Sequence, residues 1–566
     1  MSQTLDESLD ALREEHPYFC EVVLRAPDLR QARHAAQELL QRTAEPLRAA
    51  GHRFSAADAS IARGCLGVLG DVFSERGEAL AGSSALATIK RLLASGVHDA
   101  ARPAFTEDLR HLLRGAQAKA RAGESERPAY LDGGPGARRS RTAYLDRVAR
   151  QAREGLDAHP CGLDPELAEA RRALERRWLE RAGRPDADGW HAELAGAGRD
   201  PAVLHELVGL ERSEREGLAA AAEAGYPIRL SPRMVSLLGL GEASRALRPA
   251  CLPTAEEVAA ALEGAGRSDL LARRGPSAAR LSPLVDVPSW QLYGGAPLVP
   301  EGPASNKEIG RALDHLAEQA EVRELRLAGC EPFLLSDRII GDLLARLAEI
   351  EHLERVVIKT RFLAALPSRF TETLCERVFA ASGRIDLRIS ARFLTALEIT
   401  PATAAAVTRL ARAGVTVHAE APLDLGTGRR FAPAALRRAL ARAGVQSCSF
   451  RLLSARSPVS RRVPLSRALM ESEEEARRLP GLERFGRVSV TTAEGERRTL
   501  QRRRDRQPIG LLPSGERVYE FLSRDRELVS SPRRRYVDVP ILDYLTRLAA
   551  MYGEDPADYR TLWYYF

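Results

Sequence analysis

The chain has 566 residues, of which 44% are hydrophobic and 28% are charged, a composition typical of a globular protein with several domains. No apolar run reaches the ~20 residues that a membrane-spanning helix requires, and the opening segment MSQTLDESLD is too acidic and polar for a signal sequence. Seven cysteines are scattered without the spacing of a disulfide framework, so we expect a cytoplasmic protein without a membrane partner.

The net charge of +7 does not by itself predict binding to nucleic acid. Only four of the 84 basic residues are lysine, in a chain rich in alanine and leucine, and this arginine bias is typical of a GC-rich genome. Basic runs at residues 502–504 and 533–535 would suit contact with phosphate. No nucleic-acid recognition motif accompanies them, so we expect no nucleic-acid partner.

The first half of the chain has helical periodicity. Residues 1–122 are predicted to form a helical N-terminal domain, since apolar residues recur three and four apart in segments 29–50 and 105–122. Residues 123–141 include the Gly-, Pro- and Arg-rich stretch ESERPAYLDGGPGARRSR and are predicted to be a linker or long loop. The helical pattern resumes at Thr142, and residues 142–275 are predicted to form a helical region preceding the next domain.

The second half alternates short β-branched segments with amphipathic helical segments. Strands are expected at residues 290–293, 322–329, 354–360, 385–390, 415–420, 445–453 and 486–492, and helices at 306–319, 336–350, 368–381, 401–413 and 433–443. Repeated strand–helix units indicate right-handed crossovers and a parallel sheet. We therefore predict an α/β fold in which residues 276–500 form a partial or complete (β/α) barrel, with ligands at the carboxyl ends of its strands.

A C-terminal region of residues 501–566 is expected to follow the barrel. Its last 31 residues, YVDVPILDYLTRLAAMYGEDPADYRTLWYYF, hold eight of the 30 aromatic residues. Aromatic side chains bury large areas and dominate interfaces. We expect this tail to pack against the barrel or a partner subunit, and we favour packing within the chain.

Several segments in the second half resemble the lysine 2,3-aminomutase family of the radical S-adenosylmethionine (SAM) superfamily. The main ones are LAGCEPFLLSDRIIGDLLARLAEIEHLERVVIKTRFLAALPSRFTETL (327–374) and LEITPATAAAVTRLARAGVTV (397–417). Upstream, ERSEREGL, YPIRLSPRMVSLL and CLPTAEEV follow the family's order before its barrel. The resemblance covers about half of the chain. It implies a radical SAM type barrel and enzymes that use a 4Fe–4S cluster, SAM and pyridoxal phosphate (PLP).

The chain differs from this family at the positions of the cluster-binding, PLP-binding and substrate-binding residues. Segment 288–309, PSWQLYGGAPLVPEGPASNKEI, has no cysteine in place of the family's Cys-x3-Cys-x2-Cys loop, and clusters of this kind are held by cysteine thiolates. Arg498 stands where the family carries its PLP lysine, and a guanidinium cannot form the Schiff base. Thr491 and Ala455 replace two substrate-binding aspartates, and residues 390–393 replace a His-Phe-Asn-His strand end. We therefore predict no metal site and no bound cofactor.

Polar residues at the predicted strand ends are the candidate site. The ligand-binding candidates are Gly329, Cys330, Glu331, Lys359, Arg361, Arg392, His418 and Glu420. Residues 329–332, Gly-Cys-Glu-Pro, are similar to the SAM-contacting Gly-Gly-Glu-Pro turn of radical SAM proteins. The catalytic candidates are Lys359, as a new Schiff-base lysine, Glu331, and Cys330, as a nucleophile with His418 across the barrel. The alternatives are a rim ion pair for Lys359 and structural pairing for Glu331 and Arg361.

The preferred hypothesis is a lysine 2,3-aminomutase-like pseudoenzyme. It would be catalytically inactive as an aminomutase and act as a binding or scaffolding protein, with a small-anion or amino-acid pocket at the barrel mouth. A protein partner or a second copy would contact the N-terminal helices or the aromatic tail. The alternative is an enzyme of the same family with altered chemistry that binds SAM or an amino acid, such as an aminomutase-like isomerase. A third hypothesis is an active aminomutase whose cluster is held by distant cysteines.

Overall fold

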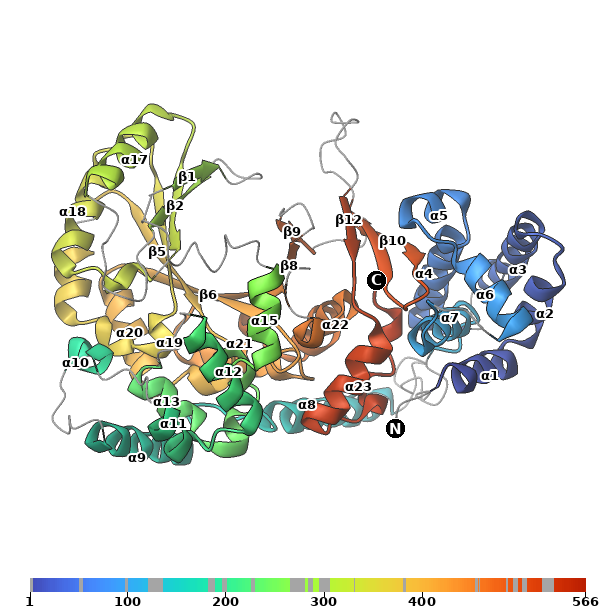
Figure 1. Ribbon diagram of the computed structural model, residues 1–566, viewed down its shortest axis with the longest axis horizontal. Helices are drawn as coiled ribbons and strands as arrows, with labels where there is room; N and C mark the ends of the chain where they lie inside the picture. Colours follow the sequence, from blue (N-terminus) through green and yellow to red (C-terminus); the bar gives the residue numbers. More distant parts are fainter. Residues whose placement is uncertain are drawn as a thin grey trace.

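The protein consists of an open α/β half-barrel and a separate module built from both ends of the chain (Figure 1). The computed structural model describes residues 4–49, 54–96, 100–120, 136–181, 189–195, 201–224, 230–264, 280–283, 289–294, 306–329, 331–379, 383–453, 457, 459–484, 487–491, 497–500, 506–521 and 534–566. Cys330 and Ala455 lie outside these residues.

The half-barrel is a nine-stranded sheet whose strands lie in sequence order. Its strands are β1 (Arg280–Pro283), β2 (Ser289–Gly294), β3 (Glu324–Gly329), β4 (Arg355–Thr360), β5 (Asp386–Arg392), β6 (Thr416–Leu423), β7 (Ser447–Leu452), β8 (Val488–Thr491) and β9 (Arg497–Thr499). Strands β2 to β8 are parallel, whereas β1 and β9 pair antiparallel at the two edges. The predicted α/β class and the partial barrel are confirmed.

Helices cover the outer, convex face of this sheet (Figure 1). They are α17 (Asn306–Glu318), α18 (Asp337–Ala348), α19 (Phe362–Ala365), α20 (Pro401–Arg412), α21 (Ala432–Arg442) and α22 (Leu465–Met470). The first turns of α18 and α20 are capped by Ser336 and Thr400, whose hydroxyls accept backbone N–H groups of the first turn. These caps and the apolar stripe behind them explain why both helices begin where the sequence pattern predicts.

One predicted helix is shorter than expected. In place of a helix over 368–381, the chain makes a 3₁₀ turn at Pro367–Arg369 and a π-helical turn at Leu374–Val378. The fully buried Arg369 donates to the carbonyls of Phe333 (2.8 Å) and Leu335 (2.9 Å). This anchoring holds the segment before Leu374 out of helical register.

Eight further helices of the described residues precede the sheet in sequence and pack beside it. They are α8 (Ala137–Asp157), α9 (Pro165–Arg181), α10 (Trp190–Ala195), α11 (Pro201–Val208), α12 (Arg212–Glu223), α13 (Pro232–Leu238), α14 (Arg248–Cys251) and α15 (Ala255–Gly264). The first of them begins at Ala137, ahead of the predicted start at Thr142. Leu394 and Leu397, which follow β5, belong to the hydrophobic core of α9 and α11–α13, so these helices are fixed to the carboxyl end of the sheet.

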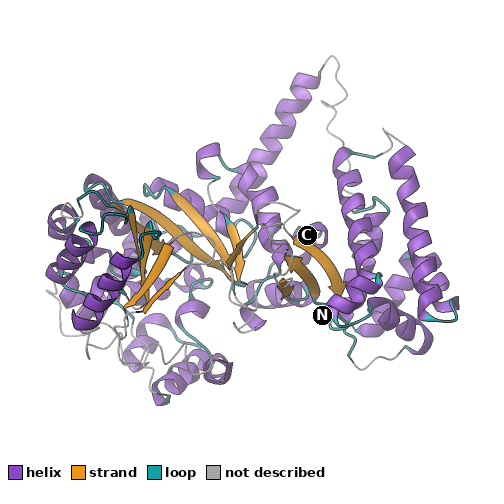
Figure 2. Cartoon of the chain, turned by 90° about the horizontal axis from the view of Figure 1, so that it is seen from above, coloured by secondary structure: helices purple, strands orange, loops and turns teal. Residues whose placement is uncertain are grey.

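The N-terminal helices and the C-terminal region share one core, which we call the terminal module. Its helices are α1 (Leu5–Glu15), α2 (Pro17–Arg25), α3 (Leu29–Ala49), α4 (Ala56–Val72), α5 (Glu75–Ala81), α6 (Ala85–Ser95), α7 (Pro103–Ala116) and α23 (Ile541–Tyr552), and its strands are β10 (Arg506–Leu511), β11 (Arg517–Phe521) and β12 (Arg534–Val537). The three strands form a small antiparallel sheet that packs on α4 and α5. Figure 2 shows this sheet apart from the strands of the half-barrel.

The aromatic tail packs within the chain, as expected, but against the N-terminal helices. Leu562, Trp563, Tyr564 and Phe566 are all buried. The indole of Trp563 stacks on the imidazole of His111 in α7, with ring centroids 4.3 Å apart and an interplanar angle of 8°. The tail therefore closes the terminal module.

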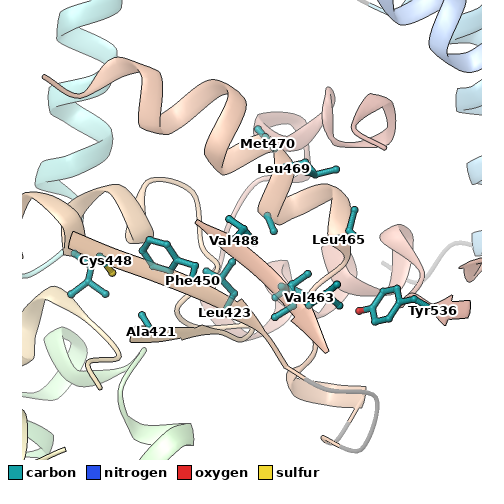
Figure 3. Packing of buried hydrophobic residues seen from close by; sticks show 14 of the residues in the cluster. Ala421, Leu423, Cys448, Phe450, Val463, Leu465, Leu469, Met470, Val488 and Tyr536 are labelled. Carbon is teal, nitrogen blue, oxygen red and sulfur yellow. The ribbon is translucent and has the colours of Figure 1, made fainter. Parts of the chain in front are cut away.

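A hydrophobic joint connects the half-barrel to the terminal module (Figure 3). Leu423 of β6, Phe450 of β7 and Val488 of β8 face Leu469 of α22, and Tyr536 of β12 belongs to the same buried cluster. The joint makes the two parts one continuous core. Among the described helices, none combines the length and the apolar character that crossing a membrane would need.

Candidate functional site

The inner, concave face of the half-barrel is polar. Along β4 the buried side chains alternate with half-buried ones, which places Val356 and Ile358 under the outer helices and Lys359 on the opposite face. The same alternation runs through β5, β6 and β7. A closed α/β barrel fills its interior with apolar side chains, whereas this half-barrel presents charged and hydroxyl groups to its concave side.

Near the amino ends of the strands, these groups form a continuous belt of ion pairs. Arg326 contacts Glu324 (2.8 Å), Glu324 contacts Arg355 (3.4 Å), and Asp386 contacts both Arg355 and Arg388 (2.8 Å each). The hydrogen bonds from Arg388, and then from Arg355, lower the pKa of Asp386. Because each carboxylate of the belt already binds two guanidinium groups, we infer that the belt has a structural role. We call these ion-paired residues the floor of the concave face.

His418 extends this belt to β7. Its Nε2 lies 3.5 Å from Nη1 of Arg388, and its Nδ1 lies 2.8 Å from the hydroxyl of Ser447. A guanidinium only donates, so Nε2 accepts and Nδ1 carries the proton toward Ser447. Burial, followed by the charge of Arg388, lowers the pKa of His418. His418 is therefore neutral at physiological pH and belongs to the floor.

Two more ion pairs lie toward the carboxyl ends of the strands. Nζ of Lys359 is 3.3 Å from Oε2 of Glu420. Nη2 of Arg361 is 3.2 Å from Oε1 of the fully buried Glu398 and 3.7 Å from the sulfur of Cys251. The structure thus pairs Lys359 with Glu420, and it pairs Arg361 with Glu398 and Cys251, which the sequence pattern did not indicate.

Glu331 has a different role from the other strand-end residues. Its carboxylate accepts hydrogen bonds from the hydroxyl of Thr360 (2.7 Å), from the backbone of Arg361 (2.8 Å) and from the backbone of Phe333 (3.2 Å). Burial raises the pKa of Glu331 to about 7. The carboxylate ties the end of β3, at Gly329, to the end of β4, which corresponds to the structural pairing considered for it.

Arg392 and Arg451, which we call the arginine pair, differ from every other cation described above. Within the part of the chain that the structure describes, neither makes an ion pair or a side-chain hydrogen bond with another residue. Arg392 ends β5 and is exposed, and Arg451 is half-buried on β7. Arg451 is two strands away from Arg392 and two residues further along the sheet. Their Cα atoms are therefore about 12 Å apart at the usual strand spacing.

The positive charge of Arg451 nevertheless acts on the guanidinium of Arg392. The pKa of Arg392 is lowered to about 10. The largest cause is that the surrounding protein removes water from the guanidinium, and the positive charges of Arg361 and Arg451 follow. Sequence reasoning missed Arg451. The alternation in Ser447–Leu452 places it on the same face as Ser447 and Ser449, and this signal was sufficient to find it.

The described residues do not fit an iron–sulfur cluster. Cys375 and Cys448 are buried under the outer helices, and burial raises the pKa of their thiols to about 11 and about 12. Where the structure describes the chain, no three His, Cys, Asp or Glu side chains are grouped as metal ligands. The sequence between β2 and α17 also contains no cysteine. Among the residues that the structure describes, the ligand set required for such a cluster is therefore missing.

The residue at the position expected for the PLP lysine does not fit a PLP aldimine either. Arg498 lies on the edge strand β9, paired with Val490 of β8. Its guanidinium has no nucleophilic free amine at neutral pH. Lys359 is the one lysine of the described concave face, and its ammonium is engaged with Glu420.

Comparison with known proteins gives a match over nearly the whole chain. The chain is 26% identical over 601 aligned positions to an uncharacterized KamA family protein of Methanocaldococcus jannaschii, covering 97% of this chain and 96% of that protein. The chain is therefore similar over nearly its whole length to a KamA family protein.

Shorter matches connect the chain to proteins named as aminomutases. It is 30% identical over 120 residues to the L-lysine 2,3-aminomutase of Bacillus subtilis, covering 21% of this chain and 25% of that enzyme. It is 28% identical over 122 residues to the L-lysine 2,3-aminomutase of Methanococcus maripaludis, covering 22% and 28%. The matches thus span about a quarter of each enzyme. No family model matches the chain.

Proposed function

We propose that this protein is a binding protein that holds a small anion or amino acid on the concave face of its half-barrel and does not catalyse aminomutation. The observation that carries the proposal is the arginine pair. Two guanidinium groups without a partner among the described residues stand at the carboxyl ends of parallel strands, where α/β proteins bind their ligands.

The electrostatic surroundings support an anionic ligand. Arg361, Arg392 and Lys359 lie toward the same end of the sheet, and the positive charges of Arg361 and Arg451 lower the pKa of Arg392. A bound carboxylate or phosphate would relieve this repulsion. Guanidinium groups also match such groups with two parallel hydrogen bonds.

The proposed loss of aminomutase chemistry rests on the residues present. Arg498 replaces the PLP lysine, and the loop between β2 and α17 contains no cysteine. We expect anaerobic reconstitution with iron and sulfide to leave less than one iron atom per chain. Stoichiometric iron with a cluster absorption band would contradict this part of the proposal and make the scattered cysteines ligands.

Anion binding is tested separately by isothermal titration of inorganic phosphate and of L-lysine at low salt. Arg392→Gln and Arg451→Gln should each weaken the tighter of these two ligands at least tenfold. The matched control is Arg412→Gln, which removes an exposed arginine from the end of α20 on the outer face and should leave binding unchanged. Equal affinity in all variants would refute binding at the arginine pair.

A scaffolding role is the remaining part of the proposal. The aromatic tail is buried within the terminal module. The exposed large apolar residues in the described part of the N-terminal helices are Tyr18 and Leu24, both on α2. A partner contact at the N-terminal helices would therefore use α2, and cross-linking from a cysteine placed at Tyr18 would detect it.

A further inference from the structure

Four carboxylates of the described concave face are paired with cations of the chain itself. Glu324 and Asp386 are held in the floor by arginines, Glu398 by Arg361, and Glu420 by Lys359. An ammonium group of a ligand needs a carboxylate to replace its hydration. At this face, such a carboxylate becomes available only by breaking an internal ion pair.

The positive charges are in excess. In the floor, three arginines share Glu324 and Asp386, which leaves one positive charge there. Toward the carboxyl ends of the strands, Arg361 and Lys359 are matched with Glu398 and Glu420. Arg392 and Arg451 are left at that end of the sheet. A ligand with two negative charges would balance the two positive charges of these guanidinium groups. A zwitterionic amino acid offers one net carboxylate and an ammonium group that repels both arginines and Lys359.

We propose that the ligand of the arginine pair is a small dianion, either a phosphate group or a dicarboxylate, and that the Lys359–Glu420 ion pair is the element that rejects an amino group. This inference rests on the proposed anion-binding function and narrows its ligand class. Lys359 acts here as a specificity residue: by neutralising Glu420 it removes the one carboxylate that lies level with Arg392 on the neighbouring strand.

Two matched ligands separate the charge effects. Succinate and L-aspartate differ by one ammonium group, and succinate and succinamate differ by one negative charge. Isothermal titration at pH 7.5 and low salt should show succinate or inorganic phosphate binding at least tenfold more tightly than both L-aspartate and succinamate. Comparing succinate with phosphate then identifies which dianion the site takes.

Variants test the roles of the residues. Arg392→Gln and Arg451→Gln should each lower dianion affinity at least tenfold, while Arg412→Gln should leave it unchanged. Lys359→Met releases Glu420 from its lysine and should raise the affinity for L-aspartate relative to succinate at least tenfold. Circular dichroism and the melting temperature confirm that each variant is folded.

The outcomes distinguish the two proposals. If L-aspartate or L-lysine binds as tightly as the dianions and loses affinity in Arg392→Gln, the anion site stands and the dianion inference is overturned. If no probe binds, or if binding ignores both arginines, the anion site itself is overturned. An unchanged aspartate-to-succinate ratio in a folded Lys359→Met variant overturns the role given to Lys359.

Discussion

Glu331 is a buried carboxyl group whose ionisation opposes folding. Three hydrogen bonds favour its charged form, yet burial is the largest effect and raises its pKa from 4.5 to about 7. The folded protein therefore holds this proton more tightly than the unfolded chain does. The stabilisation that follows is fully present below about pH 4.5 and is lost as the pH rises through about 7.

This pH dependence is measurable against Glu331→Gln, which keeps an acceptor but cannot ionise. The unfolding free energy of the wild type minus that of the variant should fall by up to about 3 kcal/mol between pH 4.5 and pH 8. Urea unfolding of both proteins at several pH values gives this difference. A constant difference, or one that rises with pH, would show that the carboxylate is better solvated than its surroundings indicate.

For single residues, the sequence predicted where in the sheet a residue lies better than it predicted which other residue it contacts. The sequence analysis placed Lys359, Arg392 and Glu420 near the ends of predicted strands, and the structure has them on β4, β5 and β6. The contact between Lys359 and Glu420 depends on how β4, β5 and β6 are staggered, which no single strand encodes. Glu331 accepts hydrogen bonds from Thr360 and from the backbone of Arg361, both at the end of the next strand. The sequence analysis considered such structural pairing but could not name these partners, because they belong to another strand.

Among the elements, α8 shows how a glycine permits close packing. A Cβ atom on Gly155 would overlap the ring of Phe431, which precedes α21 and has a positive φ of 61°. In a helix, Gly→Ala alone would stabilise by about 1 kcal/mol. At Gly155 the overlap outweighs this gain, because overpacking costs typically about 1–3 kcal/mol.

We therefore expect Gly155→Ala to lower the unfolding free energy by about 1 kcal/mol or more. The matched control is Gly67→Ala in α4, where a new Cβ has no neighbour within 4 Å, and which should gain up to about 1 kcal/mol. Thermal and urea unfolding compare the two. A stabilising effect at Gly155 would mean that α8 docks on α21 more loosely than the contact with Phe431 indicates.

The helices and strands that the sequence analysis predicted correctly are those whose hydrophobic periodicity is visible within a single segment of the chain. The half-barrel strands are β-branched and the helices between them have clear apolar stripes, so both were recognisable. The small sheet was not predicted. Its strands, such as RQPIGL and RRYV, are short and rich in arginine, and they are buried by α4 and α5, which come more than 400 residues earlier in the chain.

At the scale of the whole molecule, one buried ion pair joins the two ends of the chain. Nη2 of Arg517 in β11 lies 2.6 Å from Oδ1 of Asp108 in α7, and both side chains are almost completely buried. Arg517 also donates to the carbonyl of Trp563 at 2.8 Å. Removing one partner of such a pair leaves an uncompensated charge in the core, which costs about 3–5 kcal/mol.

Asp108→Ala should therefore destabilise the terminal module by several kcal/mol, and the loss should be visible in urea unfolding followed by tryptophan fluorescence. Asp342→Ala is the control, because it breaks the exposed pair of Asp342 with Arg338 (3.4 Å), which contributes about 0.5 kcal/mol or less. Equal effects of the two substitutions would mean that water reaches Arg517 when Asp108 is removed.

The shared core of the chain ends has a consequence for biosynthesis. Asp108 contacts Arg517 at a sequence separation of 409 residues, so the N-terminal helices emerge from the ribosome long before their strands and tail exist. At about 5–20 residues per second, the apolar faces of α4 and α7 wait for tens of seconds while the half-barrel is synthesised and folds. During that interval these helices depend on chaperones or on temporary contacts of their own, and the terminal module is the last part of the protein to mature.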